Sequence, residues 1–149
     1  MIELGAGPGA VGLAAAALGA SSVLLTDLKH LLPLISANVQ RNRLGSVASV
    51  RPLDWHAPAG VAALRPPFDL VLASDVLYQR HALQPFVRTL RALCGPETQV
   101  LLSNEHRPAL PFPRALFEDA GFLVAVLPWD SLHPDWRSPD IDVYSLRLA

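Results

Sequence analysis

The sequence predicts an α/β fold in which a doubly wound, mostly parallel sheet carries helices on both faces. Residues 1–18 hold a short apolar run, a glycine-rich turn and an apolar stretch of helical composition. Apolar runs of strand length then alternate with helical patterns five times along the chain, as in successive strand–helix units. The last two apolar runs are joined by a link that prolines interrupt, so we expect this final pair of strands to be antiparallel.

Strands are expected where a short apolar run ends in polar residues or in a turn. Runs of this length are too short for most helices and are typical of buried strands. Residues 68–74 are nearly all apolar, which indicates burial on both faces, as in the middle of a parallel sheet. The expected strands are 1–4, 21–26, 47–53, 68–74, 99–103, 122–127 and 142–148.

Helices are expected where apolar residues recur on one stripe. In residues 31–43 this stripe includes Ile35 and Val39, and Pro33 is tolerated because it falls in the first turn. Gly45 is expected to end this helix as its C-cap signal. The expected helices are 10–18, 31–43, 81–94 and 114–120, with at most a short helix in the proline- and alanine-rich residues 57–67.

Length and composition limit the class of protein. A chain of 149 residues predicts a single domain, 1–149, with its own core. The formal net charge is −1 and no basic run stands out, so we expect no strong electrostatic binding of nucleic acid. One cysteine, Cys94, and five scattered histidines predict neither a disulfide framework nor a metal site. The apolar residues 10–25 are shorter than a membrane span and lack a basic flank, so we expect no membrane segment and a cytoplasmic protein.

The glycine-rich turn indicates a nucleotide cofactor. Glycine allows a positive φ and a close approach of the backbone to a ligand, and the helix that follows offers free N–H groups. Gly5-x-Gly7-x-x-Ala10, with Asp27 further on, fits the dinucleotide fingerprint. Glu3-x-Gly5-x-Gly7-x-Gly9 also fits the first motif of S-adenosylmethionine (SAM) methyltransferases. The turn favours SAM and leaves NAD open, while an antiparallel final pair of strands is a methyltransferase rather than a dehydrogenase pattern.

Several segments, taken in order, resemble one family. They are Glu3-Leu-Gly-Ala-Gly-Pro-Gly9, Thr26-Asp27, Asn38-Val-Gln-Arg-Asn42, Leu53-Asp54-Trp55, Asp69-Leu-Val-Leu-Ala-Ser-Asp-Val-Leu-Tyr78 and Glu105-His-Arg107. The sequence resembles the seven-β-strand (class I) SAM-dependent protein-lysine methyltransferases, in the methyltransferase-like group that acts on chaperones and translation elongation factors. This resemblance runs the length of the chain. It implies a Rossmann-like class I methyltransferase sheet, SAM as cofactor and a lysine-bearing protein as substrate.

The start of the chain departs from this family. Family members have a segment with a helix before the glycine-loop strand, whereas this chain begins inside that strand. We therefore expect an N-terminally truncated methyltransferase domain, which is either a fragment or has a mis-assigned start. Its SAM binding and methyl transfer are expected to be weak, and the open site is expected to favour aggregation.

The glycine loop and Glu3 are expected to hold the methionine portion of SAM. The resemblance implies that Gly5, Gly7 and Gly9 wrap it, although a tight strand–helix turn would also use them. Glu3 is expected either to bond the amino group of the cofactor or to cap the helix N-terminus.

The nucleoside of SAM is assigned to residues that end the next strands, since ligands bind at this edge of open α/β sheets. Asp27 can accept hydrogen bonds from both ribose hydroxyls, or cap the following helix. Asp54 can accept from the adenine amine, and Trp55 can cover the adenine face or join the core. The expected cofactor-binding residues are Glu3, Gly5, Gly7, Gly9, Asp27, Asp54, Trp55 and Ser74.

Asp75 and Tyr78 follow the fourth strand and are the expected catalytic residues. The resemblance places the position of Asp75 nearest the transferred methyl group. Methyl transfer needs a neutral amine in line with the bond that breaks, whereas free lysine has a pKa of about 10.4. Asp75 is expected to orient the amine and Tyr78 to line the slot; alternatively, Asp75 supports the loop through backbone N–H groups. Glu105 and Arg107 are expected to form an ion pair that orders their loop, or to contact substrate.

Three other functions remain open at this point. The chain could methylate a small molecule, serve as a non-catalytic interaction domain with a methyltransferase-like fold, or be an NAD-linked oxidoreductase. Trp129 and Trp136, in the proline-bearing link 128–141, could line a substrate cleft or cover the sheet. No Asn/Asp-Pro-Pro-Tyr motif, Gly-x-Ser-x-Gly elbow or P-loop is present, which argues against nucleic-acid adenine methylation, glutamine methylation, hydrolysis and P-loop chemistry.

Overall fold

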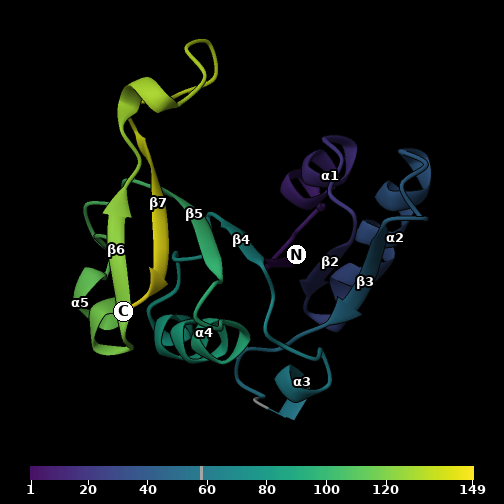
Figure 1. Cartoon of the computed structure of the whole chain (residues 1–149), viewed down its shortest axis with the longest axis horizontal. Helices are drawn as coiled ribbons and strands as arrows, with labels where there is room; N and C mark the ends of the chain where they lie inside the picture. The colour runs from purple at the N-terminus through teal and green to yellow at the C-terminus, as the bar shows by residue number, and fades with distance from the viewer. Residues whose placement is uncertain (58) are drawn as a thin grey trace.

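A seven-stranded sheet runs through the protein in the order β3-β2-β1-β4-β5-β7-β6 (Figure 1). The computed structural model describes residues 1–57 and 59–149. The pairs from β3 to β5 are all parallel, whereas β7 is antiparallel to both β5 and β6. This confirms the predicted sheet and its antiparallel end. The strands are β1 (Ile2–Leu4), β2 (Val23–Asp27), β3 (Ala48–Pro52), β4 (Leu70–Ser74), β5 (Gln99–Glu105), β6 (Phe122–Val126) and β7 (Ile141–Leu148).

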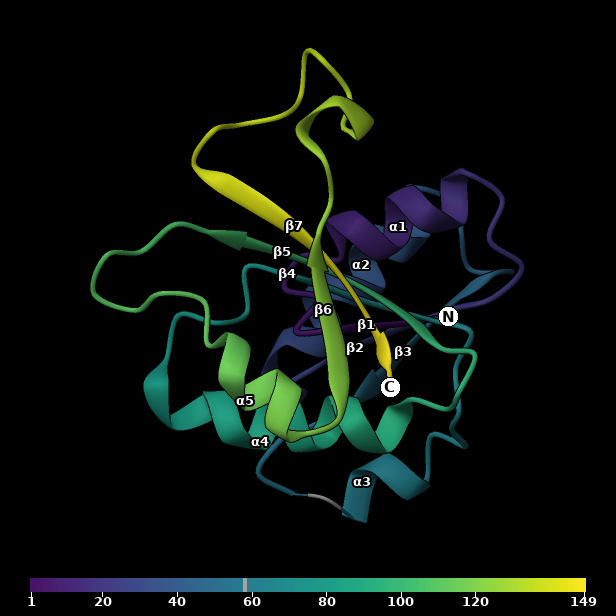
Figure 2. The same cartoon turned by 60° about the vertical axis from the view of Figure 1, so that its left-hand side comes forward.

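Helices cover both faces of the sheet, as a doubly wound fold requires. Figure 2 shows α1 and α2 on one side of the strands and α3, α4 and α5 on the other. Every predicted helix is found, within a few residues at its ends. The helices are α1 (Ala10–Ala17), α2 (Leu32–Arg41), α3 (Ala59–Ala62), α4 (Arg80–Leu93) and α5 (Arg114–Asp119), with short 3₁₀ helices η1 (Lys29–Leu31) and η2 (Trp129–Ser131).

Each face of the sheet has its own apolar core. Leu13 of α1 and Ile35 of α2 pack with Leu25 of β2 on one face. On the other face, Phe86 of α4 and Phe117 of α5 belong to a larger buried cluster with β1, β4, β5 and β7. Because side chains alternate along a strand, Ile2 and Leu4 join the larger core while Glu3 points to the α1 face.

The end of α2 differs from the prediction. Gly45 was expected to provide the C-cap, but Arg43 takes the left-handed conformation, with φ 58°. The N–H of Arg43 donates to the carbonyl of Gln40 (3.0 Å) and the N–H of Leu44 to that of Val39 (3.1 Å), which is the Schellman arrangement. These two bonds end the helix before Gly45 and offset the strain of a left-handed arginine.

Strand β5 extends further than the apolar run predicted. The run ends at Ser103, yet Asn104 and Glu105 continue the strand because they pair with Asp142 and Ile141 of β7. Antiparallel pairing thus supplies the hydrogen bonds that keep polar residues in the strand. The extension carries Glu105 to the carboxyl edge of the sheet.

Gly12 of α1 lies against β1 and β2, where a side chain would not fit. A Cβ there would touch Leu25 Cδ2 and would lie 2.6 Å from Glu3 Oε2. Both neighbours are buried, so Gly12→Ala is expected to lower the free energy of unfolding by about 1–3 kcal/mol despite the better helix propensity of alanine. Urea unfolding monitored by circular dichroism measures this change.

Gly45→Ala is the matched control for this prediction. Gly45 is absent from the glycines with positive φ, and a Cβ there would come no closer than 3.5 Å to Gln40 Nε2. Its unfolding midpoint should stay close to that of the parent chain. Equal midpoints for the two variants would show that α1 can move away from the sheet without loss of stability.

Candidate functional site

A cavity of about 630 Å³ opens at the carboxyl edge of the sheet, where β1 lies between β2 and β4. After β1 the chain crosses to one face of the sheet, and after β4 it crosses to the other face. This place is therefore the topological switch point, where ligands usually bind in open α/β sheets. Its volume is within the range of small-molecule sites. The walls come from the loop after β1, the end of β2, the loop after β3 and the segment after β4.

The three glycines of the first loop have different roles. Gly5, Gly7 and Gly9 all have positive φ, at 65°, 55° and 87°. A Cβ on Gly5 would lie 2.9 Å from Val76 Cγ1, whereas one on Gly7 would meet nothing within 4 Å. Gly5 and Gly7 line the cavity, but Gly9 is not among the described lining residues. Gly9 is instead the N-cap of α1, and its left-handed conformation allows the chain to turn into the helix.

Asp27, at the end of β2, fixes the glycine loop from across the cavity. Its Oδ2 accepts the N–H of Gly7 at 2.7 Å and its Oδ1 accepts the N–H of Leu28 at 2.7 Å. The alternative role as a cap of α2 is not seen, since the N-cap of that helix is Leu31. Each carboxylate oxygen has a further lone pair, so Asp27 can still accept hydrogen bonds from a ligand in the cavity.

Glu3 is a buried carboxyl group at the inner end of the cavity. It is 2% exposed, and its Oε2 accepts the N–H of Gly12 at 2.9 Å, which is the predicted helix-capping role. Burial raises the pKa of Glu3 to about 7, the hydrogen bond from Gly12 lowers it, and the charge of Asp27 raises it further. Glu3 also lines the cavity, so a cationic ligand group there would favour its ionised form.

Asp54 and Trp55 lie in the loop after β3 and both line the cavity. The Trp55 ring packs edge-on against Phe86 of the core, with centroids 5.0 Å apart, so the core role and the cavity role coexist. Oδ1 of Asp54 accepts the N–H of His56 at 2.9 Å, which orders the turn.

Three histidines line the cavity as well: His30, His56 and His81. Their spacing along the sequence shows no pattern that would mark them as site residues. The His56 and His81 rings stack with centroids 5.9 Å apart, although they lie on different segments. Only the loop after β3 and the start of α4 bring them together, so no local signal in the sequence could have found this pair.

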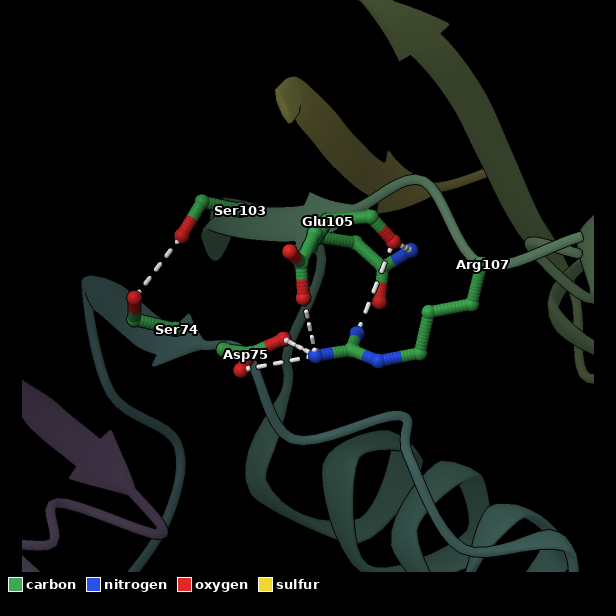
Figure 3. A network of polar contacts seen from close by, with 6 residues as sticks. Ser74, Asp75, Ser103, Glu105 and Arg107 are labelled. Carbon is green, nitrogen blue, oxygen red and sulfur yellow. Dashed lines mark hydrogen bonds and ion pairs between the residues drawn. The ribbon is translucent and has the colours of Figure 1, made fainter. Parts of the chain in front are cut away.

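Asp75 follows β4 and is held by its neighbours on β5 (Figure 3). Its N–H donates to the carbonyl of Ser103 at 2.9 Å, and the hydroxyl of Ser103 donates to Ser74 Oγ at 2.9 Å. Asp75 has φ 54°, a conformation that is unusual for a residue other than glycine. Such an outlier beside a cavity is typical of functional sites.

The carboxylate of Asp75 shares one guanidinium with Glu105 (Figure 3). Arg107 Nη2 lies 2.7 Å from Asp75 Oδ1, 3.0 Å from Asp75 Oδ2 and 2.7 Å from Glu105 Oε2. The expected ion pair between Glu105 and Arg107 is therefore present, and it extends to Asp75, which the sequence did not predict. Arg107 thus fixes the direction of a carboxylate whose side chain is 52% exposed.

The structure brings nine of the ten predicted site residues to one cavity: all except Gly9 line it. Tyr78 is 58% exposed at the mouth, on the segment that joins β4 to α4. Cys94 lies elsewhere, at the end of α4, where burial raises its pKa to about 11. That thiol stays protonated at neutral pH and is unsuited to be a nucleophile.

Outside residue 58, no three or more His, Cys, Asp or Glu side chains gather so as to hold a metal ion. None of the helices that the structure describes is long and apolar enough to cross a membrane.

Comparison with known proteins places residues 1–115 in a family whose model is described as lysine methyltransferase. EEF1A lysine methyltransferase 3 of Xenopus tropicalis is 38% identical over 110 residues, covering 72% of this chain and 47% of that protein. Protein N-lysine methyltransferase METTL21A of Mus musculus is 37% identical over 106 residues, covering 68% of this chain and 47% of that protein. The chain spans about half the length of the relatives it matches.

Solved structures share the fold at much lower identity. An O-methyltransferase family protein from Burkholderia thailandensis has a TM-score of 0.81 at 12% identity and covers 99% of this chain and 50% of its own. The glycopeptide N-methyltransferase MtfA, complexed with SAM, has a TM-score of 0.77 at 16% identity and covers 99% of this chain and 80% of its own. The predicted class I methyltransferase sheet is thereby confirmed.

Proposed function

This chain belongs to the lysine methyltransferase family, and on that premise we propose that it transfers a methyl group from SAM to the side-chain nitrogen of a lysine in a protein substrate. The observation that supports this most directly is the cavity at the switch point. Its lining combines the glycine loop and the carboxylates of Glu3, Asp27 and Asp54 with Asp75 and Tyr78, which follow β4.

The residues of the cavity fit SAM in size and in chemistry. Asp27 would accept the ribose hydroxyls, since both of its oxygens are fixed and retain free lone pairs. Glu3 would face the positively charged amino group, and Trp55 with Asp54 would hold the adenine. When bound, SAM would supply a methyl group that is attached to a positively charged sulfur. As the lysine nitrogen forms its bond to the methyl carbon, the sulfur would keep the electron pair of the broken carbon–sulfur bond.

Asp75 is the residue that we assign to the lysine. The nitrogen must present a free lone pair, so the lysine has to release a proton to the solvent before methyl transfer. A carboxylate at the cavity can accept a hydrogen bond from the amine and aim its lone pair inward. Arg107 holds both oxygens of Asp75 and so limits the directions in which the amine can be held. Tyr78, exposed beside it, would line the path of the lysine chain.

We extend the proposal to the kind of substrate. Two of the relatives are named for methylation of EEF1A, which supports a translation elongation factor as the protein that this chain modifies. Chaperones, which the family resemblance also implied, remain a second candidate. Both substrates are consistent with the cytoplasmic location that we propose for this chain.

Two measurements test the function. Isothermal titration determines whether the chain binds SAM, and transfer of tritiated methyl to a purified elongation factor, followed by mass spectrometry, determines whether a lysine is modified. We expect binding and labelled lysine. SAM binding without methyl transfer to any protein of a cell extract would favour a non-catalytic interaction domain. Labelled methyl found only in small molecules would favour a small-molecule methyltransferase. Lack of SAM binding would refute the proposal.

Replacement of Asp27 tests how the cofactor is held. Asp27→Ala is expected to weaken SAM binding by about 1.5–3 kcal/mol, because a hydrogen-bonded charged group is lost. The change is measured by titration at constant salt. Asp69→Ala is the control, since Asp69 is an exposed aspartate that directly precedes β4, at the opposite end of the strand from Asp75. A folded Asp27→Ala chain with the affinity of the parent would remove Asp27 from the site.

A further inference from the structure

The segment between β6 and β7, residues 127–140, projects from the sheet and is here termed the β6–β7 arm. Figure 1 shows it standing beyond the end of the strands, away from the helices on either face. It leaves β6 at the same edge of the sheet where Glu105 ends β5, because Ile141 at the start of β7 pairs with Glu105. The arm therefore rises from the edge that carries the candidate site.

Contacts within the arm join Arg137 to Trp129 and Asp130. The Arg137 guanidinium carbon lies 4.6 Å from the centroid of the Trp129 ring. Arg137 Nη1 also donates to the Trp129 carbonyl at 2.9 Å and to Asp130 Oδ1 at 3.3 Å. The one arginine of the arm is thus used internally, in a cation–π contact with a tryptophan.

Among residues 1–57 and 59–149, no cation lies over the ring of the second tryptophan of the arm, Trp136. Trp136 is 84% exposed, and the aromatic neighbour recorded for it is His133, with centroids 6.4 Å apart. Covering an indole this exposed would be favourable, because its apolar surface would be removed from water. The part of the chain that the structure describes leaves this ring largely uncovered.

The charge of the arm indicates which partner would cover Trp136. Residues 127–140 contain three aspartates, Asp130, Asp135 and Asp140, and one arginine, for a formal charge of −2 with His133 neutral, whereas the whole chain carries −1. All three aspartates are exposed. A positively charged partner would gain both long-range attraction and a cation–π contact with Trp136.

The base of the arm is connected to Asp75 through a tripeptide. His106 donates its N–H to the carbonyl of Asp140 at 2.8 Å, and its Nε2 lies 3.0 Å from Asp142 Oδ2. Its neighbours in sequence, Glu105 and Arg107, form the network with Asp75. A chain segment bound along the arm would therefore lead toward Asp75.

We propose that the β6–β7 arm binds a basic segment of the protein substrate, with Trp136 stacked against an arginine or lysine near the lysine that is methylated. This inference rests on the proposed function for the identity of the partner. It goes beyond that function by assigning the recognition of the substrate to residues outside the cavity and by requiring positive charge around the target lysine.

Two fluorescein-labelled peptides of equal length test the arm, each with one central lysine, one flanked by arginines and the other by glutamates. Fluorescence anisotropy is measured with the full chain, at low and at high salt. We expect the arginine-flanked peptide to bind at least about tenfold more tightly, with a preference that salt reduces. Trp136→Ala is expected to lower its affinity at least about fivefold, since a cation–π contact and an apolar surface are lost.

Matched variants separate the aromatic contribution from the charge. Asp135→Asn combined with Asp140→Asn should reduce the salt dependence, while Leu18→Ala, which changes an 88% exposed side chain after α1, should bind the peptide like the parent. Equal binding of both peptides, no binding of either by the parent chain, or an unchanged affinity in Trp136→Ala would overturn the proposal. Titration of the same samples with SAM tests the proposed function separately, because the arm does not line the cavity.

Discussion

Asp75→Asn is expected to slow methyl transfer by about 10²-fold, the loss that misplacement of a reacting group can cause, with little change in SAM affinity. The amide keeps the shape of the side chain but cannot carry the charge that attracts and orients an amine. The loss should therefore fall on the transition state rather than on the binding of the cofactor. Initial rates with tritiated SAM, together with titration, measure the two quantities.

Glu105→Gln is the control that separates Asp75 from its network. It removes one carboxylate from the same Arg107 guanidinium, with the same change of charge, at a residue outside the described lining of the cavity. We expect a much smaller loss of rate than in Asp75→Asn. Equal losses would assign the effect to the position of Arg107, and turnover of Asp75→Asn at the parent rate would make Asp75 a structural residue.

Glu3→Gln is expected to raise the free energy of unfolding at pH 8 and to leave it nearly unchanged at pH 4. The pKa of Glu3 is about 7 in the folded chain against an ordinary value of 4.5, so the unfolded chain releases this proton first as pH rises. Stability contributed by the neutral carboxyl group is complete below pH 4.5 and is lost between pH 4.5 and 7. The total loss is about 3 kcal/mol, which glutamine would avoid because it has no charge to bury.

Urea unfolding at the two pH values measures the effect of Glu3→Gln. The amide oxygen can still accept the N–H of Gly12, so the cap of α1 is kept. Glu97→Gln is the control because Glu97 is exposed. A difference between Glu3→Gln and the parent that is the same at pH 4 and pH 8 would show that the carboxyl group is not buried in its neutral form.

Local patterns predicted most of the fold because burial imposes them on each element separately. The mostly apolar run 68–74 predicted a central strand, and residues 71–73 in the middle of β4 are buried as predicted. The ends of helices and strands were less predictable, because competing hydrogen bonds determine where an element stops. Arg43 rather than Gly45 ends α2, and pairing with β7 prolongs β5 through two polar residues.

In the candidate site, too, some residues could be predicted from local patterns and some contacts could not. Residues at or just beyond the carboxyl ends of the strands, such as Asp27, Asp54 and Asp75, could be assigned to one edge because parallel strands end on the same side of the sheet. The contact between Arg107 and Asp75 joins residues 32 positions apart and depends on how the loop after β5 folds back. No local pattern in a single sequence marks such a long-range contact, and the same holds for the stacked rings of His56 and His81.

The place of β7 between β5 and β6 has a consequence for how the chain folds during synthesis. Among the described strands, β6 pairs with β7 alone, so it has no partner in the sheet until β7 has paired with β5. The ribosome, however, releases β6 before β7. Strand β6 therefore leaves the ribosome before the strand with which it pairs, and its backbone edges stay unpaired until β7 has been synthesised.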